Sequence, residues 1–133
     1  MASRVLFVCT GNTCRSPLAE ALAQERGLAA ESAGVAAQRG DGAAPYAARA
    51  LRQARGLDLD DHAPRNVAAL DLSAFDRIVA MDPSVAQRLR AEHDVDPDAL
   101  VTWTIPDPYG GALADYRYSL EQIDAALDRL RSD

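Results

Sequence analysis

VLFVCTGNTCRSP, residues 5–17, joins a short apolar run to a polar turn and then to the start of a helix. The apolar run 5–8 has no polar alternation, which predicts a strand that is buried on both faces of a sheet. The turn covers residues 9–15. We expect Ser16 to cap the following helix and Pro17 to take its first helical position. A strand, a tight turn and a capped helix in this order indicate the start of a βαβ unit.

The rest of the chain continues this alternation of strands and helices. We expect the first helix to end near Gly27, further strands near residues 31–33, at 77–81 and at 99–104, and further helices over 45–55, weakly over 66–74, from Asp82-Pro83 onward and over the C-terminal segment. The last helix has the clearest pattern, because its apolar residues recur at spacings of three and four: Tyr116, Leu120, Ile123, Leu127 and Leu130.

This alternation predicts a single α/β domain over residues 1–133. The expected architecture has three layers, with a four-stranded, mainly parallel sheet between helices on both faces. Ligands bind beyond the carboxyl ends of the strands in such sheets. The loops at 9–15 and 105–111 leave those ends, so we expect the functional site there.

The composition is that of an ordinary globular domain with an acidic balance. The 133 residues include 14 Lys plus Arg against 20 Asp plus Glu, a formal net charge of −6. This balance argues against nucleic acid or an anionic membrane as a partner. Because no apolar run approaches a membrane span and no secretory signal is evident, we expect a cytoplasmic protein with reduced thiols. Its cysteines, Cys9 and Cys14, form neither a disulfide framework nor a CxxC pair.

Five residues separate Cys9 from Arg15 in the turn, in the pattern C-x5-R-S. This spacing, closed by a helix N-terminus, lets successive backbone N–H groups turn inward around one anion. Gly11 and Asn12 tolerate the left-handed dihedrals that such a loop requires. Arg15 adds a planar guanidinium suited to phosphate oxygens. The positive surroundings favour a thiolate at Cys9, so we predict a phosphate loop with an in-line nucleophile.

A thiolate nucleophile needs a general acid for the leaving group and later a base that activates water. Asp107 is the best candidate, because Pro106 and Pro108 hold it on both sides. Its loop also leaves the same edge of the predicted sheet.

Residues 5–16 together with Asp107-Pro108-Tyr109 resemble the low-molecular-weight protein tyrosine phosphatase family. The resemblance spans nearly the whole chain and includes Ser32-Ala33-Gly34 and Ala80-Met81-Asp82. It implies a cysteine-dependent hydrolase that takes a phosphorylated protein or peptide, releases inorganic phosphate and uses no metal or other cofactor.

The same resemblance assigns roles to individual residues. Cys9 forms a phosphocysteine intermediate, Arg15 stabilises the transferring phosphoryl group, and Asp107 acts as acid and then as base. Ser16 hydrogen-bonds the thiolate and Asn12 locks the loop. The other residues implied to bind phosphate or to support the loop are Thr10, Gly11, Thr13 and Cys14.

The substrate depends on finer features. The motif CTGNTCRS, with threonine at position 13, is similar to the bacterial protein-arginine phosphatases, whereas tyrosine-directed members usually carry isoleucine there. Gln38 and Arg39 lie where the tyrosine branch often has a pocket-wall tryptophan, and Gly110 replaces a second aromatic residue after Tyr109. We therefore slightly favour phosphoarginine, with Thr13 and Tyr109 in the substrate pocket. Phosphotyrosine is the alternative.

Two other classes are less favoured. A non-catalytic phosphate-binding module would be expected to have lost Cys9, Arg15 or Asp107. A thioredoxin-coupled arsenate reductase needs a further pair of cysteines, and none follows Cys14.

By the same resemblance, Cys14 is the redox partner of the nucleophile. A sulfenic acid on Cys9 can be trapped by a neighbouring thiol as a disulfide, which predicts peroxide inactivation that a dithiol reverses. His62 and His93 have no cysteine or carboxylate company at ligand spacing, so we expect structural or exposed roles for them and no metal site.

Overall fold

The computed structural model describes residues 3–38, 40 and 42–130. Their backbone forms a four-stranded parallel sheet in the order β2-β1-β3-β4. The strands are β1 (Arg4–Cys9), β2 (Ala29–Gly34), β3 (Arg77–Ala80) and β4 (Leu100–Thr102). The helices are α1 (Arg15–Glu25), α2 (Pro45–Arg55), α3 (Pro83–Glu92) and α4 (Leu113–Leu130).

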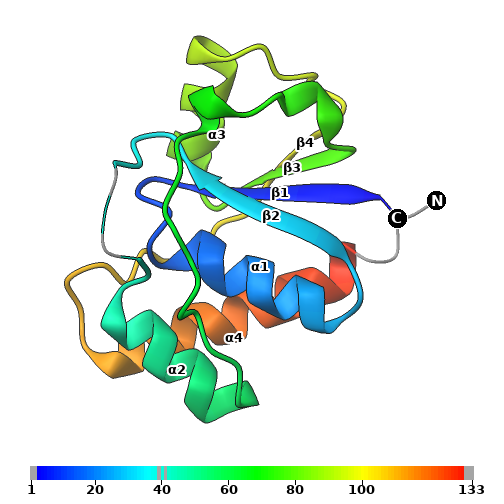
Figure 1. The fold of residues 1–133 in the computed structure, drawn as a ribbon. Helices are drawn as coiled ribbons and strands as arrows, with labels where there is room; N and C mark the ends of the chain where they lie inside the picture. The colour runs from blue at the N-terminus through cyan, green and yellow to red at the C-terminus, as the bar shows by residue number, and fades with distance from the viewer. Residues whose placement is uncertain (1–2, 39, 41, 131–133) are drawn as a thin grey trace.

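Helices cover both faces of this sheet, which confirms the predicted three-layer α/β architecture. Figure 1 shows α1, α2 and α4 below the sheet and α3 above it. The residues of β1 alternate between two apolar clusters. Phe7 packs towards α1 and α4, and its ring centroid lies 5.7 Å from that of Trp103. Leu6 lies on the other face of the sheet and packs towards α3. The strand is therefore buried on both faces, as its unbroken apolar run predicts.

Several predicted boundaries are wrong. The strand expected at 99–104 covers only Leu100–Thr102. Beyond it, the N–H groups of Trp103 and Ile105 still donate to the backbone oxygens of Ala80 and Met81, at 2.8 and 2.9 Å. The weak helix over 66–74 is a pair of short 3-10 turns, Val67–Ala69 and Leu72–Ala74. The side chains of Asn66 and Asp71 cap the N-terminal ends of these turns by accepting the N–H groups of Ala68 and Ser73.

Ser16 does not cap α1. The helix begins at Arg15, and Cys14 occupies the cap position, but its side chain makes no capping hydrogen bond to the helix. The Ser16 hydroxyl turns instead to the thiol of Cys9. The helix expected from Asp82-Pro83 onward is confirmed as α3, and Asp82 caps it, because its Oδ1 accepts the N–H of Val85 at 2.9 Å.

Within the described part of the chain, no helix is both long enough and apolar enough to cross a membrane.

Candidate active site

The loops that follow β1 and β4 emerge at the same end of the sheet (Figure 1). They border a cavity of about 400 Å³. Of the predicted site residues, Asn12 and Ser16 lie beneath the loop and the others line this cavity: Cys9, Thr10, Gly11, Thr13, Cys14, Arg15, Asp107 and Tyr109. The fold thus brings Asp107 to the same cavity as Cys9 and Arg15, although more than ninety positions separate it from them in the sequence.

The sulfur of Cys9 lies at the floor of this cavity, at the N-terminus of α1. Its side chain is buried, and Sγ is 2.9 Å from the hydroxyl of Ser16. The backbone N–H of Asn12 also donates to Sγ, at 3.2 Å. Ser16 can donate its proton to the sulfur because its oxygen already accepts from the Asn12 amide at 2.8 Å. Donors at a helix N-terminus stabilise negative charge on the atom they face.

Asn12 fixes the shape of the phosphate loop. It is fully buried and supplies the left-handed position of the loop, at φ 58°, whereas Gly11, which could also tolerate it, is not left-handed. Its amide nitrogen donates to Ser16 and, at 3.0 Å, to the hydroxyl of Ser32. Its amide oxygen accepts the backbone N–H of Arg65 at 3.0 Å. Every polar atom of the side chain is therefore engaged, which holds a conformation that few residues adopt.

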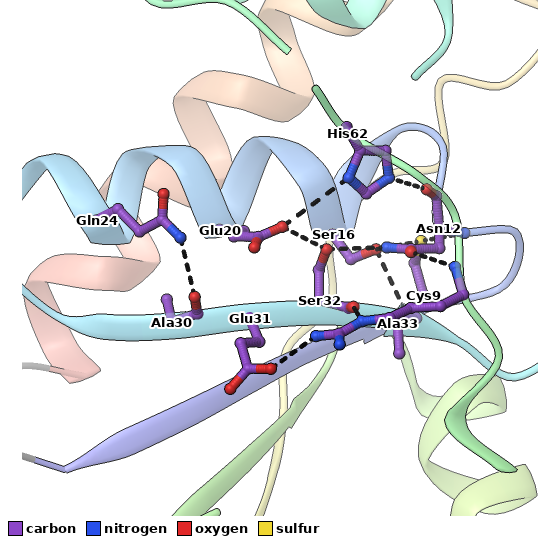
Figure 2. Close-up of polar contacts among 11 residues, drawn as sticks. Cys9, Asn12, Ser16, Glu20, Gln24, Ala30, Glu31, Ser32, Ala33 and His62 are labelled. Atoms are coloured by element: carbon purple, nitrogen blue, oxygen red, sulfur yellow. Dashed lines mark hydrogen bonds and ion pairs between the residues drawn. The ribbon is translucent and has the colours of Figure 1, made fainter. Parts of the chain in front are cut away.

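A chain of polar contacts continues behind the loop (Figure 2). The Ser32 hydroxyl donates to Glu20 at 2.6 Å, and Glu20 lies 4.0 Å from Nδ1 of His62. The other ring nitrogen of His62 donates to the backbone oxygen of Asn12 at 2.7 Å. His62 is structural, which is one of the two roles we expected for it. Sequence reasoning gave Glu20 and Arg65 no role at the loop. Glu20 follows Ser16 by four residues but acts through Ser32, and Arg65 lies 53 positions from Asn12.

Gly34, at the end of β2, lies directly against the phosphate loop. A Cβ atom there would stand 2.5 Å from the backbone oxygen of Thr10 and 2.9 Å from the backbone nitrogen of Asn12. The next residue, Val35, donates its N–H to the oxygen of Cys9 at 3.0 Å. This approach allows no side chain, which explains the glycine after Ser32-Ala33.

Arg15 is buried and held from one side. Its Nη1 donates to Oδ2 of Asp82 at 2.8 Å and to the backbone oxygen of Ile105 at 2.9 Å. Burial alone would raise the pKa of Asp82, but hydrogen bonds from Ser84, the Val85 N–H and Arg15 lower it. The carboxylate therefore stays ionised and compensates the buried guanidinium. Nη2 remains on the side of Asp107, 3.9 Å from its Oδ2.

Asp107 faces this guanidinium from a half-exposed position. Its Oδ1 accepts the N–H of Tyr109 at 3.1 Å, and the chain then turns at Gly110, where φ is 79°. Tyr109 borders the cavity, but its side chain is 78% exposed. It therefore forms the mouth of the cavity rather than an inner wall.

Cys14 is buried in the same loop as Cys9, and neither cysteine is in a disulfide. Burial raises the pKa of Cys14, so at neutral pH this sulfur is a thiol. Thr13 lines the cavity, and its hydroxyl lies 3.6 Å from the sulfur of Cys14. Arg39 lies outside the described residues. Among the described residues, no three His, Cys, Asp or Glu side chains are grouped to hold a metal ion.

Comparison with known proteins agrees with this geometry. The model of the family described as low molecular weight phosphotyrosine protein phosphatase matches residues 4–133. A protein-arginine-phosphatase of Geobacillus stearothermophilus is 31% identical, over 98% of this chain and 95% of that protein. The crystal structure of a low molecular weight protein tyrosine phosphatase from T. tengcongensis superposes with a TM-score of 0.90 at 34% identity, over 98% of this chain and 99% of that one. An arginine phosphatase variant with a phosphorylated active-site serine in place of cysteine has a TM-score of 0.83 at 27% identity, over 97% and 93% of the two chains.

Proposed function

This chain belongs to the low molecular weight phosphotyrosine protein phosphatase family, and on that premise we propose that it dephosphorylates proteins through a phosphocysteine on Cys9, with phosphoarginine as the favoured substrate. That it is a phosphatase follows from the family. The observation that supports the residue roles is the convergence of Cys9, Arg15 and Asp107 on one cavity.

The first half-reaction transfers the phosphoryl group to the sulfur. The Cys9 thiolate attacks phosphorus, an S–P bond forms and the P–N or P–O bond of the substrate breaks. The departing atom keeps the bonding electron pair and takes a proton from the Asp107 carboxyl. Arg15 and the loop N–H groups stabilise the charge on the transferring phosphoryl oxygens.

The second half-reaction regenerates the enzyme. Asp107, now a carboxylate, takes a proton from water as the water oxygen attacks phosphorus. The S–P bond breaks, the thiolate returns and inorganic phosphate leaves. The relative with a phosphorylated serine in place of its cysteine supports a covalent intermediate at this position.

The lining of the cavity supports phosphoarginine. Thr13 places a hydroxyl beside the site of the phosphate, where it can orient a polar P–N bond. The Asp107 carboxylate can also pair with a substrate guanidinium. Among the described lining residues, the one aromatic side chain is Tyr109 at the mouth. Phosphotyrosine remains the second candidate, because Tyr109 offers a stacking face to a phenyl ring.

We also propose that residues 1–133 act as one phosphatase domain in the cytoplasm. A nucleophilic thiolate requires a compartment in which thiols are kept reduced, and this requirement supports the assignment.

Changing Thr13→Ile is expected to shift selectivity from phosphoarginine to phosphotyrosine peptides by about tenfold in the ratio of kcat/KM, because isoleucine removes the hydroxyl and adds apolar volume. Release of inorganic phosphate from matched peptides measures both values. Thr102→Ile, an exposed position on β4, is the control and should leave the ratio unchanged. If neither peptide is hydrolysed by the wild type, the proposed function is wrong. A wild-type preference for phosphotyrosine, unaltered by the substitution, would rule out the substrate assignment alone.

Peroxide is expected to inactivate the wild type, and a dithiol is expected to restore most of the activity. Cys14→Ser should be inactivated as well but should recover far less, because no neighbouring thiol protects the sulfenic acid on Cys9 from further oxidation. Activity before peroxide, after peroxide and after dithiol measures the effect. Equal recovery of the two proteins would show that Cys14 is not the redox partner.

A further inference from the structure

Two hydroxyl groups of α4 contact the loop that carries Asp107. Ser119 is fully buried, and its Oγ donates to the backbone oxygen of Pro106 at 2.8 Å. Burial raises the pKa of Tyr116 to about 12, and the backbone N–H of Gly110, which points towards the tyrosine hydroxyl, opposes that rise. The two contacts therefore fall on either side of Asp107, one residue before it and three residues after it.

The placement of these hydroxyls follows from helix geometry. Residues 116 and 119 are three apart in α4, so their side chains share one face of the helix. A serine inside a helix commonly bonds a carbonyl of its own helix and weakens it. Ser119 instead donates to the loop that carries Asp107. The next residue, Leu120, packs in the apolar core. The hydroxyl thus serves the loop rather than the helix.

Tyr116 also joins the two loops of the active site. The thiol of Cys14 donates to its hydroxyl at 3.9 Å, so one oxygen contacts both the phosphate loop and the loop of Asp107. The ring is fixed by an edge-on contact with Tyr46, with centroids 5.7 Å apart. A fixed ring gives the hydroxyl a fixed position between the loops.

Asp107 depends on such anchoring because its own side chain has few contacts. Its carboxylate accepts one backbone N–H, from Tyr109, and stands 3.9 Å from Arg15. About half of the side chain is exposed. The position of the carboxyl over the cavity is therefore set mainly by the backbone on either side of it.

We propose that Ser119 and Tyr116 are positioning residues that hold Asp107 at the distance from the phosphate loop at which its carboxyl reaches the leaving group. The inference rests on the proposed function, in which Asp107 protonates that group. Misplacing a proton donor by about 1 Å can lower a rate about a hundredfold. The loss is confined to substrates whose leaving group needs the proton.

The test compares kcat/KM for phenyl phosphate, a poor leaving group, with that for 2,4-dinitrophenyl phosphate, a good one. Tyr116→Phe and Ser119→Ala are each expected to lower the value about tenfold for phenyl phosphate and less than about twofold for the dinitrophenyl ester. Tyr118→Phe is the matched control, because this tyrosine is on the same helix but is 52% exposed. It should behave as wild type on both esters.

Asp107→Asn provides the reference for a lost general acid. If it changes the ratio of the two esters while Tyr116→Phe and Ser119→Ala leave the wild-type ratio, the positioning role is wrong and the proposed mechanism stands. Equal losses on both esters would show a merely structural role and would also overturn the inference. If Asp107→Asn leaves the ratio unchanged, the acid assignment fails, and the positioning role fails with it. Tyr116→Phe removes a single oxygen atom, so this variant is expected to fold. A thermal unfolding curve measures whether it does.

Discussion

Changing Cys9→Ser is expected to lower kcat/KM by at least about four orders of magnitude, because a serine hydroxyl in this loop remains protonated and is a far weaker nucleophile than a thiolate. The N–H of Asn12 and the hydroxyl of Ser16 would still face the substituted atom. The phosphate loop should therefore keep its shape and still bind inorganic phosphate. Phosphate release measures turnover, and calorimetry with inorganic phosphate measures binding.

Cys14→Ser is the matched control, since it makes the same substitution five residues further along the same loop. Under reducing conditions it should retain most of its activity. If Cys9→Ser turned over phosphorylated peptides at a rate close to that of the wild type, the covalent mechanism would be excluded. Slow phosphorylation of the introduced serine, detected as one added phosphoryl group by mass spectrometry, agrees with the mechanism, because a serine alkoxide is a poor leaving group.

Changing Arg15→Lys is expected to lower kcat/KM about a thousandfold, in the range of other arginines that stabilise phosphoryl transfer. The guanidinium spans the site, with Nη1 on Asp82 and the Ile105 oxygen and Nη2 on the side of Asp107. A lysine ammonium is a point charge, so it cannot keep the Asp82 contact and also present a planar pair of donors to phosphate oxygens.

Steady-state kinetics between pH 6 and 8 suit this measurement, since the lowered pKa of Asp82 keeps its carboxylate ionised there. Arg88→Lys is the control, because Arg88 is an exposed arginine on α3 that pairs with Glu92. This substitution should leave kcat/KM unchanged. An Arg15→Lys enzyme that retained more than about a tenth of the wild-type kcat/KM would rule out the bidentate role of the arginine.

Local sequence predicted the parts of the fold that local forces determine. The unbroken apolar run gave the central strand β1, and apolar spacing of three and four gave α4. Ser16 shows where this reasoning fails. Its sequence context is that of a helix cap. Its hydroxyl instead hydrogen-bonds the buried sulfur of Cys9 and the side-chain amide of Asn12. The start of α1 is therefore set by contacts within the loop rather than by a capping side chain.

The candidate site divides in the same way. Cys9 and Arg15 were predicted from the C-x5-R-S spacing that a phosphate-binding loop requires. Asp107 was predicted from the prolines on either side of it. His62 could not be found, since it lies fifty residues from the Asn12 carbonyl that it contacts. The sequence indicated Asp82 only as the start of a helix and as part of the family resemblance, without a contact to Arg15. One of its oxygens does cap α3, and the other holds Arg15, a contact over 67 residues that no local pattern encodes.

The closed set of contacts around Asn12 separates chemistry from selectivity in this enzyme. The loop that handles phosphate is fastened from behind, by Ser32, His62 and the backbone of Arg65, and these contacts do not touch the cavity. Side chains at the mouth, such as Gln38 and Tyr109, take no part in that fastening. On the proposed mechanism, changes at the mouth or at Thr13, which also lines the cavity, are expected to redirect the enzyme to another phosphorylated residue without disturbing its catalytic step. Overall identity is then a poor guide to the substrate, since relatives named as arginine phosphatases and as tyrosine phosphatases resemble this chain at similar identity, 31% and 35%.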